Sequence, residues 1–324
     1  MLKLQFNHII AFLKLVRIQN LLIVAGTMYL VRYCVLAPIL KYGDLSIQLS
    51  GFLFLLLVLS TVFITSAGYV INDYFDRKTD LVNRPESVII GKKINRRYAM
   101  AFHIIFNIIG ILIGFYISVS IGEPLLSLIF ITVSGLLWFY STTYKKQLLI
   151  GNLIVAFLTA MVPLIVLLFE YPMLKSAYST LLTTFSSIFK FLTAWILGYS
   201  GFAFLLTLAR EITKDTEDFE GDRAYGIQTI PIVVGTGYTK GIIVALLGFT
   251  LIAVFYIYFT YLTNRFTLYY ILIALEIPLI YNIYRVIRAN NKKDYYISSL
   301  LTKIIMINGL IYSLLANSII PQYH

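Results

Sequence analysis

The chain has 324 residues, of which 59% are hydrophobic and only 13% are charged, whereas about a quarter of the residues in ordinary soluble domains are charged. A mean hydropathy of +0.84 over this length is more than one water-soluble core can hide, which excludes a soluble globular protein. The net charge of +11 could indicate nucleic-acid binding, but the positions of the basic residues give it another cause.

Apolar stretches of about 20 residues, the length that crosses a bilayer as a helix, recur along the whole chain. Nine can be delimited: residues 18–38, 51–71, 99–120, 124–141, 150–169, 188–209, 240–262, 268–288 and 300–319. They lack the two-residue alternation of β-barrel strands, and no Pro/Ser-rich linker divides them. We therefore predict an all-α fold, a multi-pass transmembrane helical bundle of about nine helices, as a single domain over residues 1–324.

The basic residues are distributed unevenly between the two sides of the predicted membrane. If the N-terminus is inside, 21 of the 26 Lys and Arg residues fall in cytoplasmic segments, as the positive-inside rule requires. This predicts a cell-membrane protein with a cytoplasmic N-terminus, the lipid bilayer as a partner and no nucleic-acid partner. The N-terminus shows no small-residue cleavage site, so we expect the first span to be retained.

Ten of the 15 acidic residues lie in two short windows, residues 73–86 and 211–222. The first window follows the second span and the second window follows the sixth. Because four spans separate them, both windows are expected on the same, cytoplasmic side. We therefore expect Asp-rich loops that cap the cytoplasmic ends of the helices.

Each acidic window has oxygen-bearing side chains at helical spacing. The first set, at i, i+4 and i+8, is Asn72, Asp76 and Asp80, and the second, at i, i+3 and i+7, is Asp215, Asp218 and Asp222. Each set would share one face of a helix, where the carboxylates repel one another unless a cation compensates. Mg²⁺ takes one or two carboxylates together with substrate phosphates and water. The pattern predicts a diphosphate held with Mg²⁺ between the two sets.

Basic residues accompany both windows, and they are candidate donors to diphosphate oxygens. They are Arg84, Lys145, Lys146 and Arg223. Positive-inside topology alone would also place them there, just as a single acidic cluster at a membrane surface can simply be solvated. Two clusters with matched spacing on one side favour the metal interpretation.

Two further features have a structural and a functional interpretation. Glu276 lies inside the eighth span, where ionisable residues are costly and often functional, but it could instead satisfy backbone groups freed by Pro278. Tyr69 and Phe204 lie in spans that lead to the acidic windows, and Tyr140 lies at the connection between the fourth and fifth spans. They could shield a carbocation with their π faces, or they could simply pack.

These motifs resemble those of the UbiA superfamily of intramembrane prenyltransferases. Its Asn-x3-Asp-x3-Asp pattern is met by Asn72, Asp76 and Asp80, and its Asp-x3-Asp pattern by Asp218 and Asp222. The run from Lys214 to Pro231 is similar to members with Gly221, Arg223, Gly226, Thr229 and Pro231 in the same register.

The resemblance implies a role for each candidate residue. Two Mg²⁺ ions would be held by Asn72, Asp76, Asp80, Asp218 and Asp222, assisted by Asp215. Asp76 and Asp222 would be the catalytic ones. Contacts to the prenyl diphosphate would come from Arg84, Arg223 and either Lys145 or Lys146, a choice that the approximate match at this connection leaves open.

The activity implied is transfer of a prenyl group from a prenyl diphosphate to a lipophilic acceptor, with release of diphosphate. The run that ends at Pro231 looks closest to enzymes that geranylgeranylate geranylgeranylglyceryl phosphate to make a diether lipid. An aromatic acceptor, of the quinone-precursor, homogentisate or chlorophyllide type, is the alternative. From other classes, a lipid phosphatase, a prenyl-binding scaffold and a cation-coupled transporter stay open. Transporters place ionisable residues near the midplane, whereas these acids lie at helix ends.

Overall fold

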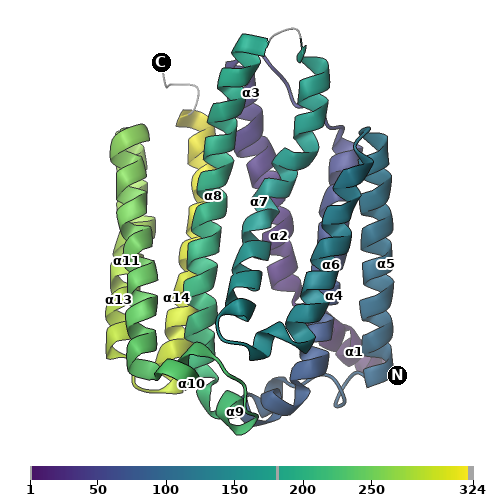
Figure 1. Cartoon of the computed structure of the whole chain (residues 1–324), viewed down its shortest axis with the longest axis vertical. Coiled ribbons are helices and arrows are strands. Elements are labelled where there is room, and N and C mark those ends of the chain that lie inside the picture. Colours follow the sequence, from purple (N-terminus) through teal and green to yellow (C-terminus); the bar gives the residue numbers. More distant parts are fainter. Residues whose placement is uncertain (1, 180–181, 320–324) are drawn as a thin grey trace. The chain divides into compact units, whose positions relative to one another are not determined.

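The computed structural model describes residues 2–179 and 182–319. In these two ranges the chain is helical, and the only β-type pairing is an isolated bridge between Ile90 and Ile94. Nine helical stretches of the described chain are long and apolar enough to cross a membrane, and each matches a predicted span (Figure 1). Their bounds are Ile18–Tyr42, Gly51–Asn83, Arg96–Ser120, Pro124–Thr142, Ile150–Ala177, Ser186–Glu217, Thr236–Tyr261, Arg265–Arg288 and Lys292–Ala316. The predicted all-α, multi-pass fold is confirmed.

The chain forms two compact units. Unit 1 comprises Met1–Gly26, Gln48–Lys146 and Leu168–Ala177, and unit 2 comprises Thr27–Ile47, Gln147–Leu167 and Tyr178–His324. The chain passes from one unit to the other within α2 (Ile18–Leu30) and α7 (Ile150–Ala177). A single domain over residues 1–324 stays a prediction.

Unit 1 is built around one long helix, α4 (Gly51–Asn83), which packs against α5 (Arg96–Ser120), α6 (Ser127–Thr142) and the N-terminal α1 (Leu2–Leu15). Short helical turns connect them: η2 (Pro85–Ser87), η3 (Pro124–Leu126) and η4 (Tyr144–Lys146). At the contact of α4 with α5, the Ser60 hydroxyl donates to the Gly110 carbonyl at 2.7 Å. A Cβ on Gly110 would meet the side chain of Ile64 at 2.6 Å, so glycine permits this close packing.

The beginning of α4 is defined by hydrogen bonds. Ahead of the helix, the buried carboxylate of Glu170 on α7 accepts the backbone N–H groups of Gln48 and Leu49. The Ser50 hydroxyl then accepts the N–H of Leu53 as an N-cap, which satisfies one donor of the first turn. The helix runs for 33 residues, well beyond the 20 or so that a bilayer needs. Its last turns therefore extend past its apolar part.

Unit 2 contains the remaining elements in chain order: η1 (Val31–Leu36), α3 (Ala37–Tyr42), α8 (Leu182–Glu217), α9 (Phe219–Ala224), α10 (Ile230–Val234), α11 (Thr236–Tyr261), α12 (Arg265–Tyr270), η6 (Ile271–Glu276), α13 (Ile277–Arg288) and α14 (Lys292–Ile319). In it, α8 packs against α11 and α14, and α13 packs against the same two helices. Leu206, Ile212, Leu247, Val286 and Ile305 form part of the apolar cluster at these contacts.

The eighth span contains a π-helical segment, η6, and Pro278 is the second residue of the helix α13 that follows it. Proline has no N–H and so frees the carbonyl of Ala274, four residues earlier. The side-chain amide of Asn308 on α14 donates to this carbonyl at 3.0 Å. Glu276 is not its partner: it is 1% exposed, and neither of its carboxylate oxygens has a hydrogen-bond partner. Asn308 thus performs the role that the sequence suggested for Glu276.

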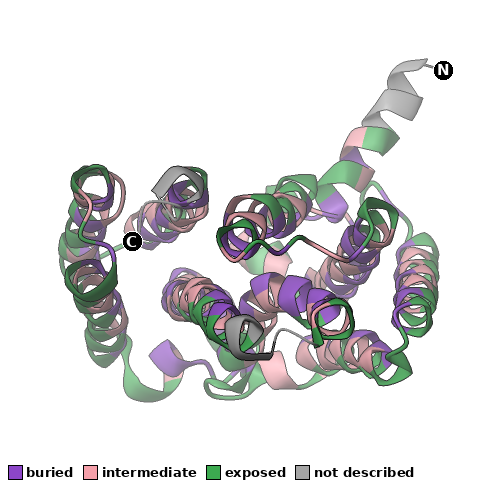
Figure 2. Cartoon of the chain, turned by 90° about the horizontal axis from the view of Figure 1, so that it is seen from above, coloured by how far each residue is buried: buried purple, intermediate pink, exposed green. Residues whose placement is uncertain are grey.

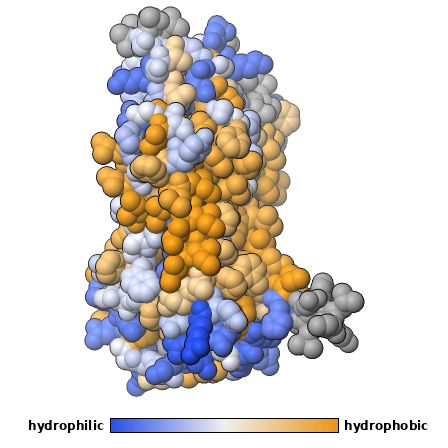
Figure 3. All heavy atoms as spheres, turned by 90° about the vertical axis from the view of Figure 1, so that its right-hand side faces the viewer, coloured by the Kyte–Doolittle hydropathy of each residue, from blue (hydrophilic) through white to orange (hydrophobic). Residues whose placement is uncertain are grey.

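The helices present buried residues on one side and exposed residues on the other (Figure 2). On the face viewed in Figure 3, apolar side chains occupy the middle and polar side chains lie towards the two ends. On α5, the exposed side chains include Ile104, Ile108, Leu112 and Phe115. An exposed apolar surface of this kind is what lipid, rather than water, solvates.

Candidate functional site

The first acidic set lies inside α4, on a helix rather than in a loop. Asn72, Asp76 and Asp80 all precede the end of this helix at Asn83, so their spacing places them on one face, as predicted. Asp76 is buried, with 9% of its surface exposed. The side-chain oxygen of Asn72 is buried and has no hydrogen-bond partner. The set therefore includes an amide oxygen that is available to a ligand.

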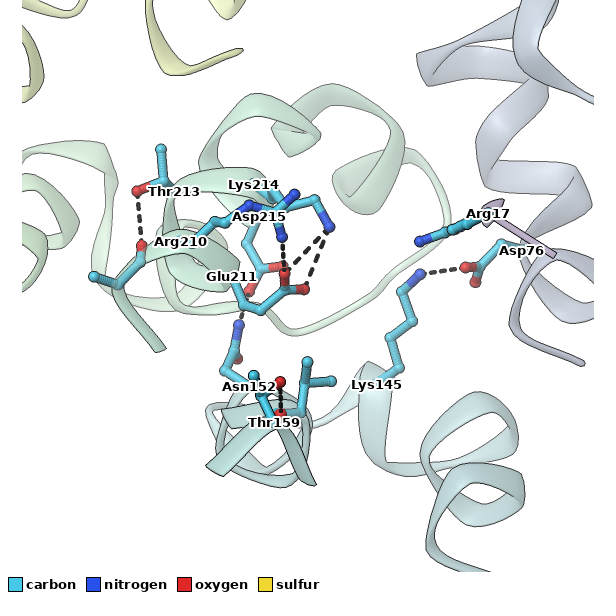
Figure 4. Close-up of polar contacts among 12 residues, drawn as sticks. Arg17, Asp76, Lys145, Asn152, Thr159, Arg210, Glu211, Thr213, Lys214 and Asp215 are labelled. Atoms are coloured by element: carbon cyan, nitrogen blue, oxygen red, sulfur yellow. Dashed lines mark hydrogen bonds and ion pairs between the residues drawn. The ribbon is translucent and has the colours of Figure 1, made fainter. Parts of the chain in front are cut away.

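Lys145, in η4, contacts this set directly. Its ammonium donates a hydrogen bond to Asp76 Oδ2 and forms an ion pair with it (Figure 4). Burial alone would lower the pKa of Lys145, but the negative charge of Asp76, with smaller contributions that include Asp80, raises it above its ordinary value. Lys145 is therefore held in its charged form, whereas Lys146 is exposed. The structure thus brings Lys145 to the acidic set.

Arg17 is a second basic residue at this cluster, and motif spacing did not identify it. Its guanidinium donates to Asp73 Oδ1 at 2.8 Å and lies 4.9 Å from the centre of the Tyr69 ring. Partial burial opposes its charge, yet Asp73 and Tyr69 raise the pKa of Arg17 above its usual range. One face of Tyr69, which was considered as a carbocation shield, is therefore occupied by Arg17 in this structure.

The second acidic set does not lie on one continuous helix, so that prediction is wrong. Helix α8 ends at Glu217, Asp218 is the N-cap residue of α9 with φ −92° and ψ 11°, and Asp222 is buried in α9. A short aspartate side chain competes with helical backbone hydrogen bonding, and here five acidic residues fall within eight positions. The face expected for Asp215, Asp218 and Asp222 is therefore divided between two helices.

Around the second set, the structure adds partners that the sequence did not reveal. The amide of Asn152 on α7 donates to Asp215 Oδ2 at 2.7 Å (Figure 4). Glu211, one turn earlier on α8, forms ion pairs with Arg210 at 2.9 Å and with Lys214 at 3.2 Å. The amide hydrogen bond fixes the orientation of the Asp215 carboxylate, and orienting contacts of this kind support metal ligands.

The two predicted arginines lie beside their clusters. Arg84 follows α4, and its backbone N–H donates to the Asp80 carbonyl at 2.8 Å. Arg223 is exposed on α9. Gly226, just beyond α9, has φ +68°, a conformation that glycine adopts readily. The matched glycine of this run therefore has a backbone role, while the diphosphate contacts of both arginines stay predictions.

The remaining residues of the matched run and the aromatic candidates also have definite positions. Thr229 precedes α10, and Pro231 lies in its first turn, where proline is favoured. Tyr140 is close enough to Lys145 to affect its pKa. Phe204 packs against the apolar cluster of unit 2.

The donor atoms of both sets fit a hard divalent cation. Carboxylate and amide oxygens are the ligand type that Mg²⁺ prefers, and the unpaired oxygen of Asn72 belongs to one set. Among residues 2–179 and 182–319, no group of three or more His, Cys, Asp or Glu side chains is gathered closely enough to hold a metal. Each set supplies few protein ligands, as is usual where phosphate oxygens and water complete the Mg²⁺ shell.

These features define a class: an integral membrane protein of several helical spans that carries oxygen-ligand clusters, with basic companions, near the ends of its helices. The chain belongs to the UbiA prenyltransferase family, whose model matches residues 25–303. The family inferred from the motifs is confirmed, and with it the expected class of enzyme.

Relatives of known name support the same conclusion. The chain is 32% identical over 245 residues to digeranylgeranylglyceryl phosphate synthase of Methanosphaera stadtmanae, a match that covers 75% of this chain and 80% of the relative. The protein of the same name from Methanothermobacter thermautotrophicus is 38% identical over 171 residues, 53% of this chain and 52% of the relative. With the latter the chain therefore aligns over about half of the relative's length.

Solved structures share the fold. One, from work on digeranylgeranylglyceryl phosphate synthase in membranes, has a TM-score of 0.62 at 23% identity and covers 96% of this chain and 98% of that one. A UbiA homologue from Archaeoglobus fulgidus bound to DMAPP and Mg²⁺ has a TM-score of 0.52 at 15% identity, covering 94% and 98%. At these identities the likeness concerns the fold alone.

Proposed function

We propose that the chain is a Mg²⁺-dependent prenyltransferase that transfers a geranylgeranyl group from its diphosphate to geranylgeranylglyceryl phosphate. The observation that carries the proposal is the α4 cluster, in which Asp76 meets the charged amine of Lys145 beside the unpaired oxygen of Asn72. Carboxylates for a metal and an ammonium for phosphate oxygens are the two complements that a Mg²⁺-bound diphosphate needs. The names of the relatives support the acceptor.

In this proposal each cluster binds Mg²⁺. Asn72, Asp76 and Asp80 hold one Mg²⁺, while Asp218 and Asp222, with Asp215, hold a second. Arg84, Lys145 and Arg223 donate to the phosphate oxygens. The clusters and the N-terminus lie on the cytoplasmic side, because positive charge is concentrated there and four spans separate the two motifs.

The reaction breaks the bond between the allylic carbon and the diphosphate oxygen and forms an ether bond to the acceptor hydroxyl, whose proton is released. Mg²⁺ held by these residues would neutralise charge that develops on the departing diphosphate. Lys145 adds hydrogen bonds to the same oxygens. The apolar helices keep water away. Water would otherwise capture the allylic cation and the result would be hydrolysis.

The test uses purified protein in lipid nanodiscs with Mg²⁺, radiolabelled geranylgeranyl diphosphate and, in separate reactions, geranylgeranylglyceryl phosphate, homogentisate or 4-hydroxybenzoate. We expect a prenylated product only with the glyceryl phosphate, identified by mass spectrometry, and none when EDTA replaces Mg²⁺. If a prenylated product forms only with an aromatic acceptor, that compound replaces geranylgeranylglyceryl phosphate as the proposed acceptor. Diphosphate release without any prenylated product would contradict the transferase and favour a lipid phosphatase.

A further inference from the structure

Lys145 neutralises a carboxylate that the proposed function assigns to Mg²⁺. Its ammonium is bonded to Asp76 Oδ2, and the side chains are 32% and 11% exposed, respectively. The pair lies in one compact unit, so the contact belongs to the packing of α4 with the turn after α6. A cation of the chain itself therefore occupies part of the first acidic set.

An ammonium and a divalent cation repel each other when both approach one carboxylate. Mg²⁺ that binds Asp76 Oδ2 must therefore displace the Lys145 ammonium, and the amine loses this anionic partner unless another is present. A diphosphate supplies that partner, since its oxygens accept hydrogen bonds from ammonium groups. Mg²⁺ thus releases the Lys145 ammonium that binds the diphosphate, and the diphosphate stabilises the ammonium that Mg²⁺ displaces.

The side chain of Lys145 can make this exchange without backbone movement, because its four-carbon stem is flexible. Arg17, the other cation at the cluster, is held differently. It bonds Asp73 rather than a proposed metal ligand, and its guanidinium also lies over the ring of Tyr69. Of Lys145 and Arg17, only Lys145 therefore forms its described ion pair with a proposed metal ligand.

We propose that Lys145 makes the binding of Mg²⁺ and of prenyl diphosphate interdependent, by holding Asp76 until the diphosphate takes over its ammonium. The inference rests on the proposed function. It makes Lys145 a positioning residue for the metal as well as a contact for the substrate. Because such coupling is reciprocal, each ligand tightens the other by the same factor, typically about 5- to 150-fold.

The experiment measures binding, with Mn²⁺ as a paramagnetic probe of the metal site and a non-hydrolysable geranylgeranyl thiolodiphosphate as the substrate analogue. In the wild-type protein we expect the analogue to tighten Mn²⁺ binding about tenfold, a factor within that range. In Lys145→Gln we expect Mn²⁺ alone to bind several-fold more tightly than to wild type, and the analogue to tighten Mn²⁺ binding by a smaller factor than in wild type, because only direct coordination by its phosphate oxygens remains. Loss of a lysine with only a structural role would not increase the affinity for the metal.

Two matched variants complete the design. Lys175→Gln removes an exposed amine elsewhere in the same unit and should behave as wild type. Lys145→Arg keeps a cation and should keep Mn²⁺ binding weak in the absence of analogue. Unchanged Mn²⁺ affinity and unchanged coupling in Lys145→Gln would overturn the inference.

The measurement on the wild-type protein does not depend on whether the variants fold. If Mn²⁺ and the analogue bind independently to it, the inference is wrong, whatever the variants do. If that protein still forms the prenylated product, the proposed function stands. If it neither binds the analogue nor forms a product, the proposed function fails as well.

Discussion

The two acidic clusters carry similar residues but are built differently. On α4 the helix is unbroken, and Lys145 forms an ion pair with Asp76, a member of the set, while Arg17 pairs with Asp73 beside it. At the end of α8 the helix breaks at Asp218, and Asp215 accepts a hydrogen bond from a neutral amide. The ion pairs described there fall on Glu211, outside the motif. In the first cluster Mg²⁺ must therefore displace the Lys145 ammonium, whereas in the second an amide orients the Asp215 carboxylate.

The largest effect expected is the loss of turnover when either cluster loses a ligand. Asp76→Asn and Asp222→Asn should each lower the rate of diphosphate release by about 100-fold or more, in line with the loss of an electrostatic contact to the transition state. Glu220→Gln, an exposed change in the second window, is the control and should retain activity. Circular dichroism and size-exclusion chromatography check folding. Full activity of one aspartate variant would mean that only one cluster is catalytic.

A smaller effect is expected at Asn152, which orients Asp215 in the second cluster. Asn152→Leu should raise the Mg²⁺ concentration for half-maximal rate about tenfold, as loss of a contact behind a metal ligand does. Asn152→Asp should raise it further, because a like charge would face Asp215. Gln147→Leu, an exposed change at the edge of the same unit, should leave the Mg²⁺ dependence as it is. An unaltered Mg²⁺ dependence in both Asn152 variants would remove Asp215 from the metal site.

The smallest effect is expected at Arg17. Its side chain is 37% exposed and that of Asp73 is 21% exposed, so solvent weakens their ion pair, and exposed pairs contribute about 1 kcal/mol or less. Arg17→Gln should lower the unfolding free energy by about that amount and change turnover less than tenfold. A double-mutant cycle with Asp73→Asn, followed by thermal unfolding in detergent, measures the pair. A loss of turnover comparable to that of Asp76→Asn would make Arg17 part of the catalytic site.

Features set by local periodicity could be predicted from the sequence. The nine spans follow from the lengths of apolar runs, and the shared face of Asn72, Asp76 and Asp80 follows from i, i+4 spacing on a helix that does not break. The second set has equally regular spacing, yet Asp218 leaves the helix. Spacing predicts a shared face only where the backbone continues, and a run of acidic residues is a poor guarantee of that.

Partners far apart in the chain could not be predicted. Asn152 lies 63 residues from Asp215, and Arg17 lies 56 residues from Asp73; neither belongs to a periodic pattern. Glu276 illustrates the same limit. The sequence suggested that it serves the backbone near Pro278, but Asn308, 34 residues from Ala274, takes that carbonyl.

The length of α4 has a consequence for how the first acidic set is held. Its 33 residues extend about 50 Å, against a hydrocarbon thickness of about 30 Å. The same rigid rod that is anchored in lipid thus carries Asn72, Asp76 and Asp80 beyond the apolar layer. The helix is continuous from Gly51 to Asn83, so helix packing rather than the conformation of a loop sets the position of these three side chains.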